Sequence, residues 1–318
     1  MKTLVICVPT YDRNASLAAL LESFNELELP PRDAVSVSVL VIDNNRDGRA
    51  ETVVRAASAD APALPIRYVH ETKPGVSHVR NRALDSCSEA DLIAFIDDDE
   101  LPHPGWIVGL WERWRLTGAG AVFGPVKAVY PNGTPNWVLS GDFHSIPIDR
   151  DGPRRITGAT CNCLIHLPTV RELGLRFDPG LSTVGGEDTL FFDTLLQRGG
   201  RLENTTKAVT FEIVPLSRTR LDWLKRRWRR GGMTDALMFA RRGHLRRPRL
   251  SAFGQGVARI VAGGGLFALA WLLSFGRMTP GVARRIYTVQ RGRGMVDFAF
   301  DRRLEEYARP GLSGAQPT

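Results

Sequence analysis

The residues best suited to chemistry are four consecutive acids at positions 97–100, Asp-Asp-Asp-Glu. They follow an apolar run, residues 92–96, that is long enough for one buried strand. Carboxylates crowded at a strand end repel one another and lose hydration, so we expect a cation to compensate them. Oxygen ligands at this spacing suit Mg²⁺ or Mn²⁺, which characteristically joins one or two carboxylates to substrate phosphates. For this run taken alone, a solvated acidic turn is the alternative.

A second pair of acids, Glu187 and Asp188, follows two glycines. The residues after the pair have apolar side chains at helical spacing as far as position 196. Acids are favoured at the positive end of a helix dipole, which explains the pair without any function. The glycines, however, permit a close approach of the backbone to a ligand.

Strands and helices that would position the first acids alternate over the first hundred residues. Apolar runs predict strands, and the segments between them have the spacing and N-cap residues of helices. The predicted strands are residues 4–8, 35–42, 64–69 and 92–96, and the predicted helices begin near residues 14–16, 50 and 75. The short connections indicate parallel βαβ units with right-handed crossovers, in an α/β protein.

Polar residues follow three of these strands, at positions 11–13 (Tyr-Asp-Arg), 43–45 (Asp-Asn-Asn) and 97–99. In an open parallel sheet, ligands bind outside the carboxyl ends of the strands, so these side chains should converge on one rim. No Gly-x-Gly-x-x-Gly follows the first strand, which argues against a dinucleotide-binding fold. The pattern Gly-x-x-x-x-Gly-Lys-Ser/Thr is also missing from the sequence, which excludes a P-loop.

Beyond residue 100 the pattern is less regular. Residues 105–115 predict a helix whose tryptophans pack in the core, and residues 120–126 predict a strand. Residues 130–155 are rich in Pro, Gly and Asn and predict an irregular binding loop. The four cysteines are scattered in apolar surroundings and predict reduced thiols of a cytosolic protein. Cys161, Cys163 and His166 have poor spacing for a zinc site.

The C-terminal third differs in charge. The 318 residues carry a formal net charge of +8, and arginine is concentrated after residue 215, which suits an anionic partner or membrane. Residues 260–275 are uncharged and lie between Arg259 and Arg277. As a helix, this stretch would measure roughly 24 Å, against roughly 30 Å of bilayer hydrocarbon. It therefore predicts an interfacial helix, with packing on the catalytic domain or a dimer contact as the alternative.

Five motifs in order resemble those of family 2 glycosyltransferases with the GT-A fold, in particular bacterial exopolysaccharide and capsule enzymes. They are residues 8–13 (VPTYDR), 41–45 (VIDNN), 75–83 (GVSHVRNRA), 95–99 (FIDDD) and 186–188 (GED). The resemblance implies a Rossmann-like, mostly parallel sheet with flanking helices. It also implies a catalytic domain, residues 1–215, with a nucleotide-binding half to about residue 100 and an acceptor half at 101–215. A basic helical region, residues 216–309, would follow, and residues 310–318 would be a disordered tail.

The resemblance also implies transfer of a sugar from a nucleoside diphosphate donor, with a UDP-sugar favoured. Asp43 would contact the nucleobase, and Pro9 and Tyr11 would flank the base or ribose. Arg80 matches the family's nucleotide-side arginine. The alternatives are a strand-end turn residue for Asp43, sheet-edge packing for Tyr11 and a surface position for Arg80.

Within the acidic run, the resemblance assigns Asp97 to the ribose and the metal, and Asp99 to the metal, Mg²⁺ or Mn²⁺. Asp98 would be the variable middle residue on the nucleotide side. The cation would neutralise the diphosphate as it leaves. Asp188 would be the general base that takes the acceptor hydroxyl proton in an inverting displacement, with Glu187 supporting it.

Together these features predict a metal-dependent enzyme on the cytoplasmic face of the inner membrane. It would extend a lipid-linked glycan during synthesis of a cell-surface polysaccharide. Arg227 and Trp228 match the Gln-x-x-Arg-Trp motif of processive members, but Leu224 occupies the glutamine position, which leaves processivity open. The rival hypotheses are a polyprenyl-phosphate sugar synthase and, of another class, a basic nucleic-acid-binding protein. Nucleic-acid binding would fall steeply with salt and survive Asp99→Ala.

Overall fold

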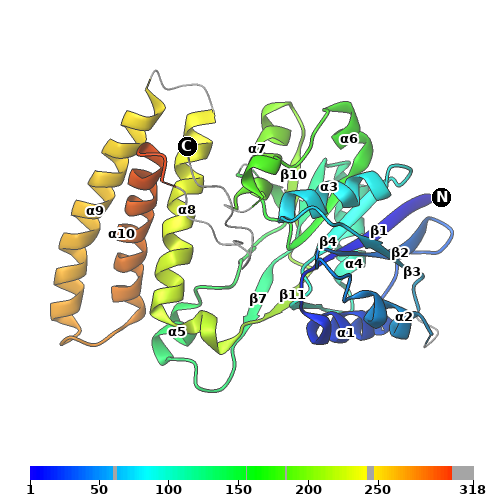
Figure 1. Cartoon of the computed structure of the whole chain (residues 1–318), viewed down its shortest axis with the longest axis horizontal. Helices are drawn as coiled ribbons and strands as arrows, with labels where there is room; N and C mark the ends of the chain where they lie inside the picture. Colours follow the sequence, from blue (N-terminus) through cyan, green and yellow to red (C-terminus); the bar gives the residue numbers. More distant parts are fainter. Residues whose placement is uncertain (60–62, 155, 183–184, 242–246, 303–318) are drawn as a thin grey trace. The chain divides into compact units, whose positions relative to one another are not determined.

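The computed structural model describes residues 1–59, 63–154, 156–182, 185–241 and 247–302 (Figure 1). The predicted tail, residues 310–318, lies outside the described residues. The chain forms two compact units, and two short excursions within the first 213 residues group with the C-terminal helices. Unit 1 comprises Met1–Val129, His144–Ser182 and Glu187–Ile213, and unit 2 comprises Tyr130–Phe143, Thr183–Gly186 and Val214–Thr318.

Unit 1 is built on an eight-stranded sheet with the order β3-β2-β1-β4-β9-β6-β10-β8. Its strands are β1 (Lys2–Thr10), β2 (Val35–Asp43), β3 (Ile66–His70), β4 (Leu92–Ile96), β6 (Ala121–Phe123), β8 (Gly152–Arg154), β9 (Asn162–His166) and β10 (Leu202–Asn204). The four predicted strands, β1 to β4, are confirmed and run parallel. In contrast, β9 is antiparallel to both of its neighbours, β4 and β6.

The alternation of side chains along β1 shows how this sheet is covered. Leu4, Ile6 and Val8 point into one core, which also contains residues of α1 (Asn14–Ser23), α2 (Glu51–Ala59) and α4 (Trp106–Thr117). Val5 and Cys7 point into a second core with α3 (Val76–Ser86), α6 (Leu167–Glu172) and α7 (Glu187–Gln197). Figure 1 shows α3 and the α1–α2 pair on opposite sides of the sheet. Because both faces are buried, the strands have continuous apolar runs.

The prediction of one strand over residues 120–126 is wrong. The chain leaves the large sheet after β6, and β7 (Val126–Val129) joins β5 (Glu100–Pro102) and β11 (Thr210–Ile213) in a separate three-stranded sheet. The change of sheet occurs at Gly124, where a Cβ would lie 2.0 Å from the carbonyl oxygen of Ala208. The predicted irregular loop, residues 130–155, contains the short helix α5 (Asn136–Gly141) and ends in β8. Single turns of 3₁₀ helix lie at Phe24–Glu26, Pro179–Leu181 and Leu216–Thr219.

The predicted core role of the tryptophans in α4 is confirmed for Trp106 and Trp111, which are 0% and 8% exposed. The indole N–H of Trp106 donates a hydrogen bond to Oδ1 of Asn162 over 2.9 Å. A buried indole therefore has its polar atom satisfied, as packed tryptophans usually do.

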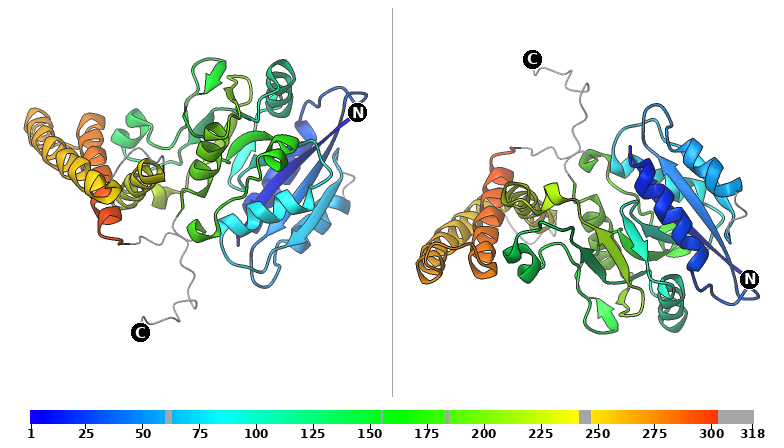
Figure 2. Two further views of the ribbon diagram at one scale, coloured as in Figure 1. Left: turned by 90° about the horizontal axis from the view of Figure 1, so that it is seen from above. Right: turned by 90° about the horizontal axis from the view of Figure 1, so that it is seen from below.

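Unit 2 contains three long helices, α8 (Leu221–Arg241), α9 (Pro248–Leu273) and α10 (Pro280–Ala299), of which α10 packs against both others (Figure 2). Glycines bring the helices together. A Cβ at Gly256 of α9 would lie 2.7 Å from the carbonyl oxygen of Gly292 of α10, and a Cβ at Gly232 of α8 would lie 2.0 Å from that of Arg291. Larger side chains at these contacts would force the helices apart.

The argument that the apolar C-terminal segment is too short to span a bilayer is wrong. Residues 260–273 are the second half of α9, a helix of 26 residues, which corresponds to about 39 Å at the rise of an α-helix. Arg259 does not end the helix, because its guanidinium faces Asp235 of α8 at 3.5 Å. Asp235 also accepts a hydrogen bond from Arg291 of α10, so one carboxylate joins all three helices.

Candidate active site

The acidic run is tied to the end of β1 through Asp98, which is 4% exposed. Its Oδ2 accepts a hydrogen bond from the Thr10 hydroxyl (2.8 Å), and its Oδ1 accepts one from Nη1 of Arg13 (2.7 Å). The same Nη1 also donates to Oδ2 of Asp99 (2.8 Å). Both carboxylate oxygens of Asp98 are therefore engaged by the protein, which favours an anchoring role over the predicted nucleotide contact.

Two carboxyl groups near Asp98, those of Asp97 and Glu100, are difficult to ionise. Burial, followed by the Asp99 carboxylate, raises the pKa of Asp97 to about 7. Burial, followed by Asp97, raises the pKa of Glu100 well above its usual value, and Oε2 of Glu100 is buried with no hydrogen-bond partner among the described residues. Buried carboxyl groups that resist ionisation fit a divalent cation bound beside them.

No three His, Cys, Asp or Glu side chains are grouped to hold a metal within the described part of the chain. Mg²⁺, however, is usually held by one or two carboxylates and completed by waters and substrate phosphates. The chemistry at the end of β4 fits such an incomplete site, and Asp97 and Asp99 remain its predicted ligands.

The raised pKa of Asp97 predicts how stability depends on pH. Without metal, folded Asp97 keeps its proton up to about pH 7, whereas the unfolded side chain loses it near pH 4. The contribution of Asp97 to the free energy of unfolding is therefore fully present below about pH 4. It is lost as the pH rises to about 7. From pH 6 to pH 8 we expect Asp97 to lower Tm by about 3 °C. Differential scanning fluorimetry in EDTA measures this, and Asp97→Asn or added Mn²⁺ should flatten the slope. An unchanged slope in Asp97→Asn would contradict the assignment.

The loop after β2 is organised around Asp43, which is fully buried. Its Oδ1 accepts the N–H of Asn45 (2.7 Å), and its Oδ2 accepts the N–H of Ala50 (2.9 Å) and the hydroxyl of Tyr68 (3.1 Å). Asp43 thus fixes the conformation of this loop. Its predicted direct contact with the base remains a prediction.

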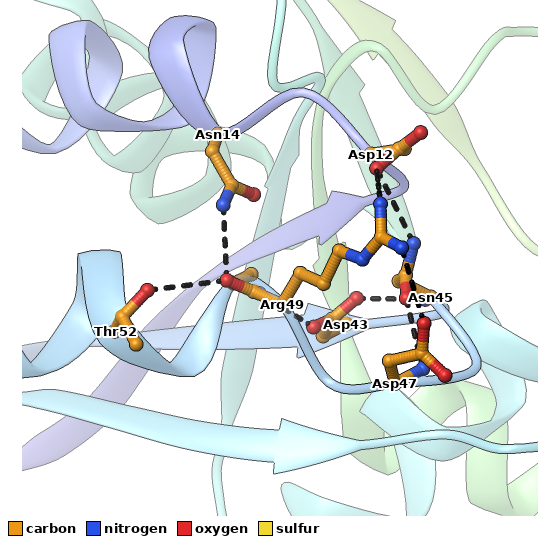
Figure 3. Close-up of polar contacts among 8 residues, drawn as sticks. Asp12, Asn14, Asp43, Asn45, Asp47, Arg49 and Thr52 are labelled. Atoms are coloured by element: carbon orange, nitrogen blue, oxygen red, sulfur yellow. Dashed lines mark hydrogen bonds and ion pairs between the residues drawn. The ribbon is translucent and has the colours of Figure 1, made fainter.

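A second set of contacts joins this loop to the turn after β1 (Figure 3). The Arg49 guanidinium lies between Asp12 (3.5 Å) and Asp47 (3.2 Å). The carbonyl oxygen of Arg49 accepts hydrogen bonds from the side chains of Asn14 (3.0 Å) and Thr52 (3.3 Å). The polar segments that follow β1 and β2 therefore form one connected rim.

Pro9 and Tyr11 lie on the same rim. In the β1–β2 register, Pro9 is opposite Ile42 and Thr10 is opposite Asp43. Tyr11 follows the end of β1 and is 44% exposed. An exposed aromatic ring beside a fixed loop is suited to stacking on a base or ribose.

Two residues that were predicted to have different roles, Arg80 and Glu187, form an ion pair. Arg80 lies on α3 and Glu187 at the start of α7, and they are 7% and 4% exposed. Nη1 of Arg80 donates to Oε1 of Glu187. Burial raises the pKa of Glu187, although the Arg80 guanidinium opposes that shift.

Asp188 follows Glu187 and is partly exposed. Its Oδ1 accepts the N–H (2.6 Å) and the hydroxyl (3.3 Å) of Thr189. After burial, which has the largest effect, the carboxylates of Asp97 and Asp188 both contribute to raising the pKa values of Cys161 and Cys163. Asp97 and Asp188 therefore lie near the same short segment around the start of β9.

The roles of Thr10, Arg13, Asn44 and Asn162 were not anticipated. Asn44 supports the segment that leads into α3, because its amide donates to the carbonyls of Glu71 (2.7 Å) and Lys73 (2.8 Å). Asn162 is 2% exposed and donates to the carbonyls of Pro125 (3.0 Å) and Ala208 (2.7 Å), which lie near the junction of the two sheets. The available signal for Asn162 was an amide at the start of an apolar run, because a buried amide needs partners.

The mixed α/β sheet, with its polar rim and its acidic strand end, has a GT-A-like fold. Two solved structures share this fold. The mannosyltransferase PcManGT from Pyrobaculum calidifontis, in complex with GDP-Man and Mn²⁺, has a TM-score of 0.62 and 18% identity over 94% of this chain and 87% of its own. S. aureus TarS 1–349 in complex with UDP-GlcNAc has a TM-score of 0.51 and 14% identity over 91% and 90%.

The model of "Glycosyl transferase family 2" matches residues 5–173, and the chain belongs to this family. It is 38% identical to the succinoglycan biosynthesis protein ExoM of Rhizobium meliloti (strain 1021), over 88% of this chain and 86% of that protein. It is 24% identical to the glycosyltransferase AglE of Haloferax volcanii, over 53% and 54%. The predicted family and fold are therefore confirmed, and the protein is a glycosyltransferase.

Proposed function

We propose that this glycosyltransferase transfers a sugar from a nucleoside diphosphate sugar, with UDP-sugars favoured, to a lipid-linked glycan during synthesis of a cell-surface polysaccharide. The observation that carries the proposal is the acidic end of β4, where burial and the Asp99 carboxylate raise the pKa of Asp97 and Oε2 of Glu100 is buried with no hydrogen-bond partner among the described residues. The similarity to a succinoglycan biosynthesis protein supports a polysaccharide product. Related folds in complex with GDP-Man and with UDP-GlcNAc support the donor class.

On the donor side, Tyr11 and Pro9 would pack against the base or ribose, and Asp43 would shape or contact the base site. Arg80 was predicted on the nucleotide side, and its ion pair with Glu187 gives it a contact on the acceptor side as well. Asp97 and Asp99 would hold Mg²⁺ or Mn²⁺. The bound cation would neutralise the diphosphate and stabilise its charge as the group leaves.

On the acceptor side, Asp188 would take the proton of the attacking hydroxyl. The hydroxyl oxygen forms a bond to the anomeric carbon while the bond from that carbon to the diphosphate oxygen breaks. A single displacement of this kind inverts the anomeric configuration. Glu187, paired with Arg80, would support the backbone from which Asp188 projects.

A donor panel tests this function. The purified chain is incubated with UDP-, GDP- and dTDP-sugars, with Mn²⁺ or with EDTA, and release of the nucleoside diphosphate is measured. We expect release with one nucleotide class that depends on Mn²⁺ and increases when lipid-linked glycan is added. An increase with polyprenyl phosphate alone would indicate the rival sugar synthase, and no release with any donor would overturn the proposal.

We further propose that α9 attaches the protein to the cytoplasmic face of the inner membrane. Among the described residues, α9 is the one helix long and apolar enough to cross a membrane by length and composition. Its exposed side chains are most apolar near its C-terminal end, where Leu272 and Leu273 are 72% and 70% exposed and Phe275 beyond it is 91% exposed.

The charge of the neighbouring sequence supports an anionic membrane as the partner. Residues 236–296 contain eleven of the 42 basic residues and none of the 34 acidic ones. Arg284, Arg285 and Arg293 of α10 are exposed along the helix that packs on α9. Arginines are costly in hydrocarbon but favourable among headgroups, so an interfacial position fits this helix pair better than a spanning one.

Vesicle binding tests the attachment. We expect Leu272→Glu with Leu273→Glu to lower binding to vesicles containing anionic lipid by about 10-fold or more, because each buried leucine contributes about 1.5–3 kcal/mol. Co-sedimentation measures the bound fraction. Leu116→Glu is a matched control, since Leu116 of α4 is 75% exposed. Equal binding by the double variant and the control would contradict the proposal.

A further inference from the structure

Helix α3 and the residue before it contact one distant part of the chain at four positions. The contact residues are Gly75, Ser77, Arg80 and Asn81, and their partners lie between residues 177 and 187. Residues 77, 80 and 81 are spaced at three and four positions, so they lie along one side of the helix. This motif was expected to serve the nucleotide, yet these contacts are with the segment that leads to Glu187 and Asp188.

The first of these contacts is a pair of hydrogen bonds between Asn81 and the backbone of Phe177. Nδ2 of Asn81 donates to the Phe177 carbonyl (2.8 Å), and Oδ1 accepts the Phe177 N–H (3.0 Å). The Phe177 ring stacks on Phe191 of α7, with ring centroids 4.2 Å apart. Asn81 therefore fixes the start of the segment, and Phe177 transmits that position to the helix that carries Asp188.

Further along, Ser77 and Gly75 hold the same segment. The Ser77 hydroxyl, which is buried, donates to the carbonyl of Asp178 over 2.8 Å. Gly75 has a φ of +119°, and a Cβ there would lie 2.5 Å from Cβ of Ser182. A side chain at position 75 would be strained and would push residue 182 away.

The last contact is with Glu187, which follows residues 183–186 in the sequence. Arg80 pairs with Glu187, and its guanidinium lies over the Phe177 ring at 5.8 Å from the centroid. One side of α3 thus holds the chain both before and after the glycine pair. Asp188 is the next residue after this fixed point.

We propose that Ser77, Arg80 and Asn81 are positioning residues that set the direction of Asp188 toward the acceptor hydroxyl. This inference rests on the proposed role of Asp188 as the general base. A displacement of about 1 Å at a reacting group can lower a rate by about 10²-fold. Loss of one of these contacts should therefore lower kcat while donor binding stays intact.

The test compares Asn81→Ala, Ser77→Ala and Arg80→Lys with Arg82→Ala, a control at an exposed residue of the same helix. We expect kcat to fall about 10- to 100-fold in the three variants, the dissociation constant of UDP or the active nucleotide to change less than 3-fold, and the control to match the native chain. Ser77→Thr keeps the hydroxyl and should retain most of the kcat that Ser77→Ala loses. Hydrogen exchange should increase at residues 177–182 in Asn81→Ala and stay unchanged in β4.

Two results would overturn the inference. One is weaker nucleotide binding with normal kcat in Arg80→Lys and Asn81→Ala. That result would show that this side of α3 binds the nucleotide and does not position Asp188. The other is native kcat in Ser77→Ala and Asn81→Ala despite faster exchange at residues 177–182. Asp188→Asn distinguishes a failure of the proposed function from a failure of this inference. If the Asp188→Asn enzyme stays active, Asp188 is not the general base, whatever the α3 variants do.

Discussion

Asp188→Asn should lower kcat by about 10²–10⁴-fold, the range that a general base contributes. Asn keeps the size of the side chain and an oxygen at the Oδ1 position, which accepts the hydrogen bonds from Thr189. The fold should therefore be retained. The amide cannot take a proton from the acceptor hydroxyl, so only the chemical step should suffer.

The measurement is steady-state transfer to the acceptor, together with nucleotide binding by calorimetry and Tm. Glu172→Gln, at an exposed acid on α6, is the control and should behave as the native chain. A decrease confined to KM, or a kcat within about threefold of the native value, would show that another group accepts the proton.

Asp99→Asn should lower kcat/KM by about 10²–10³-fold, the loss typical when one group that stabilises transition-state charge is removed. Mn²⁺ should no longer strengthen donor binding. The same change should lower the pKa of Asp97 toward its usual value, because the Asp99 carboxylate is the largest electrostatic cause of its elevation after burial. Tm in EDTA should be maintained, since one of several repelling charges is gone.

Asp98→Asn is the informative comparison, because Asp98 carries the neighbouring charge but is engaged by Thr10 and Arg13. We expect it to lower Tm and to retain a response to Mn²⁺. Isothermal titration with Mn²⁺ and the active donor measures both variants. Reversed behaviour, with Asp98→Asn losing the Mn²⁺ response and Asp99→Asn keeping it, would exchange the two roles.

The parallel half of the fold could be predicted because its signals are local. Each of β1 to β4 contains a short apolar run and is followed by polar residues that end it, and β1 and β4 are buried on both faces. The acidic run and the Glu187–Asp188 pair could be located for the same reason. The change of sheet at Gly124 could not, because the space there is limited by the carbonyl of Ala208, a residue more than eighty positions away.

The partners of the site residues were also beyond sequence reasoning. Asp43 was expected to face a ligand, yet its oxygens are taken by backbone N–H groups of its own loop and by Tyr68. Arg80 was predicted from its motif to lie on the nucleotide side, whereas its partner, Glu187, is 107 residues away in sequence. Pairings of this kind follow from tertiary structure, and no spacing rule along one helix predicts them.

The length of α9 was underestimated because charge was used to mark its start. Arg259 is compatible with the helix interior since Asp235 faces it, and Gly256 and Gly263 are contact points with α10. Glycine in a helix interior usually lowers the stability of the helix. Here it permits close helix packing.

The acid-free sequence of residues 236–296 has a practical consequence for handling the enzyme. Without those residues, the chain carries 31 basic and 34 acidic side chains, so the whole positive excess comes from the helical hairpin and its flanks. In a cell lysate, the basic residues of this segment can bind the phosphates of RNA and DNA. Material isolated in dilute buffer should therefore absorb strongly at 260 nm and release that contaminant in concentrated salt, with its sugar-transfer activity unchanged.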